Sequence, residues 1–144
     1  MARQDYSFRL TERLLYDYKY QDSAIRTLQE ERKALSDDDL PSCSTSIVLS
    51  QGKTGPQSQT EKWALRRAEK TTRLDRRIAE KKRQRDCIKK ARQQLTEEEG
   101  QFIWLRYDHE KPHHEIWPAL HMSRSAYFEF RKATIAKIAK YIGL

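Results

Sequence analysis

Two long stretches of the sequence contain neither glycine nor proline, and this feature restricts the fold more than any other. The first stretch covers residues 6–35 and the second covers residues 60–93. Within each stretch, apolar residues recur at steps of three and four, which is the spacing of one face of an α-helix. The pattern therefore predicts two long amphipathic helices.

The apolar stripe of each predicted helix is thin. The first stripe consists of Leu14, Tyr18, Ile25, Leu28 and Leu35, with Gln21 and Arg32 in its gaps. The second consists of Trp63, Ala64, Ala68, Leu74, Ile78, Ile88 and Ala91. A helix with so little apolar surface is not stable alone in water, so the two must pack on each other or on another subunit. We therefore expect a helical hairpin or coiled coil that forms a homo-oligomer.

Residues 37–59 separate the two predicted helices and are rich in residues that interrupt helices. Serine, aspartate, glycine and proline dominate this segment, which is typical of a loop or linker. The expected organisation is an N-terminal helix at 1–36, a linker at 37–59 and a basic second helix at 60–94. Residues 1–36 and 60–94 would together form the oligomerisation region, and residues 95–144 a separate domain.

The character of the sequence changes at Leu95, where aromatic and aliphatic residues become dense. Thr96 followed by Glu99 has the spacing of a capping box, and Ser123 has the position of an N-cap before a last helix. Pro112 is suited to the start of the helix between them, and Pro118 is expected to kink or end that helix after Trp117. Three short helices with a tight link before the last one predict a helix-turn-helix in an all-α protein.

The apolar positions of this C-terminal region indicate its core. The first helix is expected to bury Phe102, Ile103 and Leu105, and the second to bury Ile116, Trp117 and Leu120. The last helix is expected to bury Tyr127, Phe130, Thr134, Ile135, Ile138 and Ile142. Gly100 lies inside the first of these helices, where glycine costs about 1 kcal/mol relative to alanine.

The net charge of +8 favours an anionic partner such as nucleic acid. The excess lies in residues 60–94, which hold fourteen basic and five acidic side chains. No apolar run is long enough to span a membrane, and the two cysteines have no metal-site spacing, so we expect a cytoplasmic protein. Nucleophile and phosphate-loop motifs are absent from the sequence, so we expect neither an enzyme nor a cofactor.

The histidines were considered as metal ligands. His109 and His113 have a spacing that zinc sites use, but Pro112 lies between them and no supporting third ligand follows. We therefore expect no metal site.

Several C-terminal segments resemble the region-4-type helix-turn-helix of bacterial sigma factors. These segments are Leu95–Glu99, Phe102–Tyr107, Glu115–Ile116 and Leu120–Ser125, with Arg131, Lys132, Ile135, Lys137 and Ile138 closing the pattern. Together with the long N-terminal helix, the linker and the charged second helix, the layout resembles the RinA/ArpU family of phage transcriptional regulators. The resemblance implies a sequence-specific DNA-binding regulator that activates late phage genes with the host RNA polymerase. It also implies a location at the nucleoid of the bacterial host cell.

In such modules the start of the last helix faces base edges in the major groove. The residues expected to contact DNA are Ser123, Arg124, Ser125, Phe128, Glu129, Arg131 and Lys132. Arg124 can donate two hydrogen bonds to guanine, Glu129 can accept one from cytosine, and Phe128 can contact a thymine methyl group. Arg131 and Lys132 are expected to contact phosphates.

Further candidate phosphate contacts lie outside the start of the last helix. They are His113, His114, Lys137, Arg76 and Lys82. For the basic helix at 60–94 two interpretations stay open. Its lysines and arginines either follow a DNA backbone or form a solvated face whose aliphatic stems cover thin apolar surface.

Two other functions compete with transcription regulation. A small terminase subunit of phage DNA packaging also combines a helix-turn-helix with a coiled coil, although that class typically places the DNA-binding module first. A helical adaptor that binds another protein without contacting DNA is the second alternative. The zero net charge of residues 95–144 favours the adaptor, whereas the local excess of basic residues in 123–144 favours DNA binding.

Overall fold

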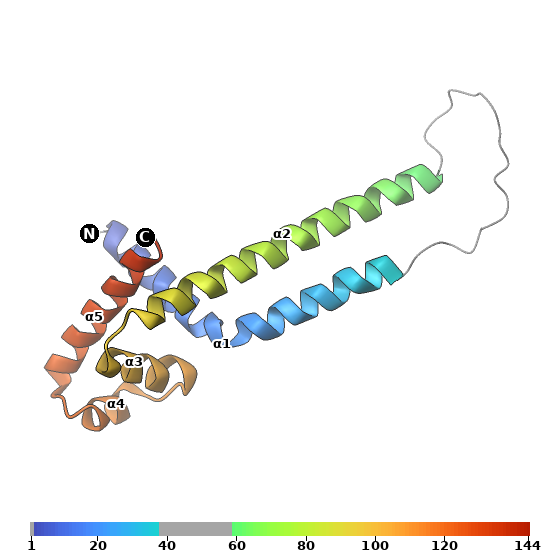
Figure 1. Ribbon diagram of the computed structural model, residues 1–144. Coiled ribbons are helices and arrows are strands. Elements are labelled where there is room, and N and C mark those ends of the chain that lie inside the picture. Colours follow the sequence, from blue (N-terminus) through green and yellow to red (C-terminus); the bar gives the residue numbers. More distant parts are fainter. Residues whose placement is uncertain (1, 38–58) are drawn as a thin grey trace, which may run out of the picture. The chain divides into compact units, whose positions relative to one another are not determined.

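The structure is a computed structural model that describes residues 2–37 and 59–144, and these ranges consist of helices and the short turns between them (Figure 1). The helices are α1 (Ala2–Asp37), α2 (Gln59–Gln93), α3 (Glu97–Ile103), the π-helix η1 (Trp104–Asp108), α4 (His113–Ala119) and α5 (Arg124–Tyr141). No strand occurs in the described ranges. The predicted all-α fold is confirmed. Of the predicted linker, residues 38–58 lie outside the described residues, and Asp37 and Gln59 belong to the helices.

The chain divides into two compact units, and the division does not follow the expected ranges. Unit 1 consists of Met1–Asp22 with Lys82–Leu144, and unit 2 consists of Ser23–Lys81. Each long helix thus contributes to both units. The reason lies in the core of unit 1, where Leu15 of α1 and Ile88 of α2 are buried with the C-terminal helices. Residues 95–144 alone are therefore not the compact unit.

The core of unit 1 is built around the aromatic ring of Phe102, which is fully buried. Its centroid lies 6.1 Å from that of Tyr107, 5.7 Å from that of Tyr127 and 5.8 Å from that of Phe130, each in an edge-to-face arrangement. Such arrangements add about 0.5–1.5 kcal/mol per pair to the burial of the rings. The predicted core residues that are buried are Phe102, Ile103, Leu105, Ile116, Leu120, Tyr127, Thr134, Ile135 and Ile138. Phe130, Trp117 and Ile142 are half-buried and pack against this core.

Unit 2 is a pair of helices that lie side by side, with a small core (Figure 1). The core consists of Ile25 and Leu28 of α1 with Leu74 and Ile78 of α2. An ion pair between Arg32 and Asp75 (2.5 Å) also joins the helices. The predicted apolar stripe of α2 is not buried at the start of the helix, where Trp63, Ala64 and Ala68 are exposed. Periodicity identifies a helix face correctly but does not show how far along the helix that face is covered.

The predicted caps of the short helices are confirmed. The Thr96 side chain accepts a hydrogen bond from the Glu99 amide, and the Glu99 carboxylate accepts one from the Thr96 amide, at 3.3 Å each. Ser123 Oγ accepts a hydrogen bond from the Ala126 amide at 3.2 Å and caps α5. Pro118 lies inside the last turn of α4, which continues to Ala119. The helix therefore does not end after Trp117, because a proline near the end of a helix removes only one hydrogen bond, and the alternative of a kink at Pro118 stays a prediction.

The link between α4 and α5 is a four-residue turn, Leu120 to Ser123. The Met122 amide donates to the Trp117 carbonyl (2.9 Å) and the His121 amide donates to the Pro118 carbonyl (3.1 Å), which is a Schellman motif. This motif requires positive φ at His121, and the observed value is 56°. The turn is therefore closed by backbone hydrogen bonds that set the direction in which α5 begins.

Candidate nucleic-acid interface

The first half of α5 exposes a group of polar and aromatic side chains on the side opposite to the core. We call these residues the α5 outer face: Arg124, Ser125, Phe128, Glu129 and Lys132, all exposed. Ser125, Glu129 and Lys132 follow each other at steps of four and three, so they share one side of the helix. The opposite side is occupied by buried core residues. The structure thus brings together five of the seven residues predicted to contact DNA.

Phe128 is held in place by neighbouring rings while part of its surface stays exposed. Its ring centroid lies 5.4 Å from that of His113 and 6.2 Å from that of Trp117, both on α4, and Phe128 remains 37% exposed. The Arg124 guanidinium lies 6.0 Å from the Phe128 ring centroid, a cation–π distance. Arg124 and Phe128 therefore form a pair whose position depends on α4.

Ser123 takes part in the site through the backbone. Its hydroxyl is used in capping, as described above, and its carbonyl accepts a hydrogen bond from the Tyr127 amide at 2.9 Å. Its role is therefore to fix where α5 begins. A helix N-terminus is also the positive end of the helix dipole, which favours phosphate.

Arg131, expected to contact phosphate, lies within the protein network of unit 1. Its guanidinium donates a hydrogen bond to Oε1 of Glu12 on α1, and it lies 5.1 Å from the ring centroid of Phe8. The Tyr107 hydroxyl donates to the same Glu12 oxygen at 3.0 Å. Side chains of Arg131 and Glu12 are each 20% exposed. The geometry gives Arg131 a structural role that joins α5 to α1, and we leave it out of the α5 outer face.

The Glu12 carboxylate accepts a hydrogen bond from the buried Tyr107 hydroxyl and affects its pKa. Burial, and next the negative charge of Glu12, raises the pKa of Tyr107 far above its ordinary value, so the hydroxyl keeps its proton. Burial lowers the pKa of Arg131, but the charge of Glu12, the hydrogen bond to it and the nearby Tyr107 and Tyr127 together outweigh this effect, and the net change is upward. Both donors to Glu12 are thus protonated at all ordinary pH values.

Lys137 is also engaged within the protein. Its Nζ lies 2.9 Å from Oε1 of Glu99, the capping-box residue of α3. Burial raises the pKa of Glu99, but the hydrogen bonds from Lys137 and Thr96 outweigh this effect and the net pKa is lowered. Lys137 therefore joins α5 to α3 and has a partner other than phosphate.

The two histidines of α4 differ in their surroundings. His113 is half-buried, and its Nδ1 lies 2.6 Å from the Tyr127 hydroxyl. Burial, and next the positive charges of Arg106 and Arg131, lowers the pKa of His113, so this ring is neutral at pH 7. A neutral ring does not attract phosphate by charge. His114 is exposed and stays a candidate phosphate contact.

The remaining candidates, Arg76 and Lys82, are both exposed on α2. Arg76 belongs to unit 2 and Lys82 to unit 1. Arg76 borders a shallow depression on α2 with Leu65, Ala68 and Glu69. Both interpretations of the basic helix, the DNA-backbone contact and the solvated face, stay predictions.

The first turns of α1 lie beside α5 and limit the accessible part of its surface. A depression of about 450 Å³ is lined by residues of α1, such as Asp5 and Phe8, and by Phe128, Lys132 and Ala136 of α5. Lys132 therefore marks the border between the exposed start of α5 and the part that lies next to α1.

Sequence reasoning missed Glu12, Thr11 and Leu15, although Thr11 and Leu15 are fully buried. The available signal was the four-residue spacing of Phe8, Glu12 and Tyr16, which places them on one side of α1. The Tyr16 ring packs edge-to-face on Tyr107 at 4.7 Å. This side of α1 faces the other helices of unit 1.

In the described ranges, no three His, Cys, Asp or Glu side chains gather in a way that would bind a metal ion. His109 packs instead against the Trp104 ring at 4.0 Å. In the same ranges, none of the helices combines the length and apolar character needed to cross a membrane.

Comparison with known proteins does not assign the chain to a family. No protein-family model, curated protein or solved structure matches this sequence or its fold.

Proposed function

We propose that this chain is a homo-oligomeric regulator of transcription that binds double-stranded DNA through the α5 outer face. In this proposal it belongs to the phage regulators that its layout resembles, and it works at the host nucleoid with the host RNA polymerase. Arg124 and Glu129 read base edges, Phe128 contacts a thymine methyl group and Lys132 contacts a phosphate.

One observation carries the proposal. Helix α5 follows α4 through a four-residue turn, its core side is buried, and its first two turns remain exposed. This is the arrangement in which the second helix of a helix-turn-helix enters the major groove. Ala126 and Ala133, both exposed between the longer side chains, leave room for a close approach to the groove.

The charges of α5 predict how strongly one copy binds. Arg131 and Lys137 are engaged in ion pairs, which leaves Arg124, Lys132 and Lys140 exposed against Glu129. About two or three phosphate contacts per copy would give a slope of about −2 to −3 in log K against log salt. One copy therefore binds weakly, and oligomerisation is needed for a useful affinity.

The test begins with selection of duplexes from a random-sequence library by the full-length chain. Affinity for a selected and a scrambled duplex is then measured for wild type, Arg124→Ala and Lys132→Ala, variants that each remove one positive charge. Arg124→Ala should lose about 1–3 kcal/mol on the selected duplex and much less on the scrambled one. Lys132→Ala should weaken both by the same factor. Equal losses for Arg124→Ala on both duplexes would contradict its role in reading bases.

A helical adaptor that binds protein is the second candidate. The observation in its favour is that two of the five basic residues of α5 are engaged in ion pairs, which lowers the charge available for phosphate. If selection yields no preferred duplex and binding to all duplexes is equally weak, the adaptor function replaces the regulator.

A further inference from the structure

The first part of α2 is a helix without any buried side chain. All residues from 59 to 73 are exposed or half-buried, and Trp63 and Leu65 are 46% and 51% exposed. An isolated helix of this composition is only marginally stable in water, because nucleation is costly and packing supplies most of the stability. This part of α2 therefore presents apolar side chains, Trp63 and Leu65, that a binding partner can cover.

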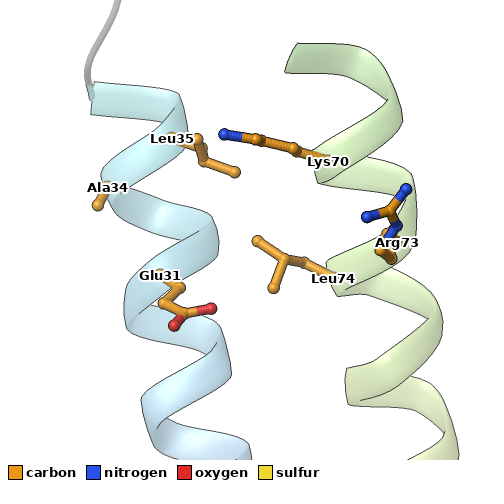
Figure 2. Close-up of a pocket in the computed structure, with 6 residues that line it drawn as sticks. All are labelled: Glu31, Ala34, Leu35, Lys70, Arg73 and Leu74. Atoms are coloured by element: carbon orange, nitrogen blue, oxygen red, sulfur yellow. The ribbon is translucent and has the colours of Figure 1, made fainter. Parts of the chain in front are cut away.

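Unit 2 contains a groove between its two helices, close to this uncovered segment. The groove has a volume of about 390 Å³. Its lining residues are Glu31, Ala34, Leu35, Lys70, Arg73 and Leu74. Figure 2 shows the side chains of Leu35, Lys70 and Leu74 extending into the space between α1 and α2. The centre of the groove is apolar, and its charged side chains lie around this centre.

The two helices carry opposite charge on the groove side. On α1 this side presents Glu31 with Ala34. On α2 it presents a row of basic residues at steps of four, three and four: Arg66, Lys70, Arg73 and Arg77. All four are exposed. The groove side therefore carries one acidic residue, Glu31, on α1 and a basic row on α2.

We propose that the groove side of unit 2 binds the groove side of a second copy, with α1 of each copy lying over α2 of the other. The contact is a four-helix bundle with a two-fold axis parallel to the helices. In it, Glu31 of each copy faces Lys70 and Arg73 of the other. The inference deepens the proposed function, because it rests on the homo-oligomer proposed there and names the surface that forms it.

The charge pattern selects this axis over the alternative. A two-fold axis perpendicular to the helices would place α2 over α2 and bring two rows of four basic residues into contact. Like charges at such short distances repel each other. An axis parallel to the helices places acidic against basic residues at both symmetry-related positions. Only the parallel axis therefore matches opposite charges.

The apolar residues favour a second copy over DNA as the occupant. Leu35 and Leu74 offer no hydrogen bonds to phosphate, and Glu31 repels it. A second copy brings the same apolar residues and buries them in pairs. The described part of α1 in unit 2 covers residues 23–37 and is about 22 Å long, so the contact is short and we expect a weak dimer that forms at micromolar concentration.

The test is a charge exchange in the full-length chain without DNA. Sedimentation equilibrium should show wild type in a monomer–dimer equilibrium at micromolar concentration. Glu31→Arg and the double variant Lys70→Glu/Arg73→Glu should each raise the dimer dissociation constant about tenfold or more, because each places like charges together. An equimolar mixture of the two variants should restore association close to wild type, because every facing pair is again opposite in charge.

Mixing distinguishes the interface from a fold defect, since repulsion within one chain is not relieved by a second chain. The matched control is Glu69→Arg, which makes the same charge change on another face of α2 and should leave the constant within about twofold. Circular dichroism verifies the helix content of each variant, and Glu31→Gln serves if Glu31→Arg does not fold.

Three outcomes would overturn the inference: a wild type that stays monomeric at tens of micromolar, variants that associate as wild type does, or a mixture without recovery. A monomeric wild type that still selects a duplex would remove this interface and the homo-oligomer but leave DNA binding in place. A dimeric wild type that selects no duplex would keep this interface and the homo-oligomer but remove DNA binding. If the wild type is monomeric and Lys70→Glu/Arg73→Glu lowers its affinity for DNA, the basic row of α2 is a DNA contact and not a dimer contact.

Discussion

Replacing Glu12 is expected to destabilise unit 1 more than replacing any exposed acidic residue. One carboxylate oxygen of Glu12 accepts hydrogen bonds from the buried Tyr107 hydroxyl and from Arg131. Removing the carboxylate leaves a buried phenol without an acceptor and a largely buried guanidinium without a counter-charge. Groups left in this state cost more than the hydrogen bond itself contributes.

The size of the effect follows from these two contacts. Hydrogen bonds to a charged group contribute about 1.5–3 kcal/mol each. Because the two donors share one oxygen and Arg131 keeps some contact with water, we expect a total of about 2–4 kcal/mol for Glu12→Ala. Glu12→Gln keeps an acceptor for Tyr107 and should lose about 1–2 kcal/mol. In a unit of about 85 residues, each kcal/mol lowers Tm by about 4–8 °C.

The assay should report on unit 1, where Glu12, Tyr107 and Arg131 lie. Trp104 and Trp117 lie in unit 1, whereas Trp63 lies in unit 2. Urea unfolding followed by tryptophan fluorescence in a Trp63→Phe background therefore measures the free energy of unfolding of unit 1.

The control and the contradicting result use the same background. Asp17 forms an ion pair with Arg13 at 3.9 Å, and the two side chains are 48% and 81% exposed. Asp17→Asn should change the free energy of unfolding by less than about 0.5 kcal/mol. If Glu12→Ala also stays within this limit, the assignment of Glu12 and Arg131 as a structural link is refuted, and Arg131 returns to the candidate phosphate contacts.

Three further changes have expected outcomes in the same unfolding assay. Gly100→Ala should raise the free energy of unfolding by up to about 1 kcal/mol, because an added Cβ meets no atom within 4 Å; a loss would contradict this. His121→Gly should also stabilise, by up to about 1 kcal/mol, since His121 has positive φ, whereas His121→Val should destabilise. The pKa of His113 is lower in the folded chain than in the unfolded chain, where it is about 6.5. As the pH falls below this value, His113 is protonated more readily in the unfolded chain, so the free energy of unfolding decreases. His113→Gln should flatten this pH dependence.

Local sequence signals predicted where α3 and α5 begin. The capping box at Thr96 and Glu99 and the cap at Ser123 depend on residues three apart, so spacing alone identifies them. The buried positions Leu74 and Ile78 on α2 follow from the 3.6-residue period in the same way. These features need no knowledge of the rest of the chain.

Contacts between distant residues were beyond the reach of the same reasoning. Glu12 lies 95 residues from Tyr107 and 119 residues from Arg131, and no periodic pattern connects such positions. For this reason Arg131 was expected to face outward with its neighbour Lys132. The partner of Lys137, Glu99, lies 38 residues away, and it was identified from the sequence only as a capping residue.

Unit 1 combines residues 1–22 with residues 82–144, so its core forms only late in synthesis on the ribosome. Residues up to Asp22 are translated first, but their core partners lie between Lys82 and Leu144. At roughly 5–20 residues per second, the 122 residues from Ser23 to Leu144 take about 6–24 s to be made. Until residues 82–144 have emerged, Phe8, Leu15 and Tyr16 lack these core partners, so we expect chaperones that recognise exposed apolar segments to bind the emerging α1. Ribosome-bound chains stalled before residue 95 should therefore be sensitive to protease in α1, and the completed chain should be resistant there.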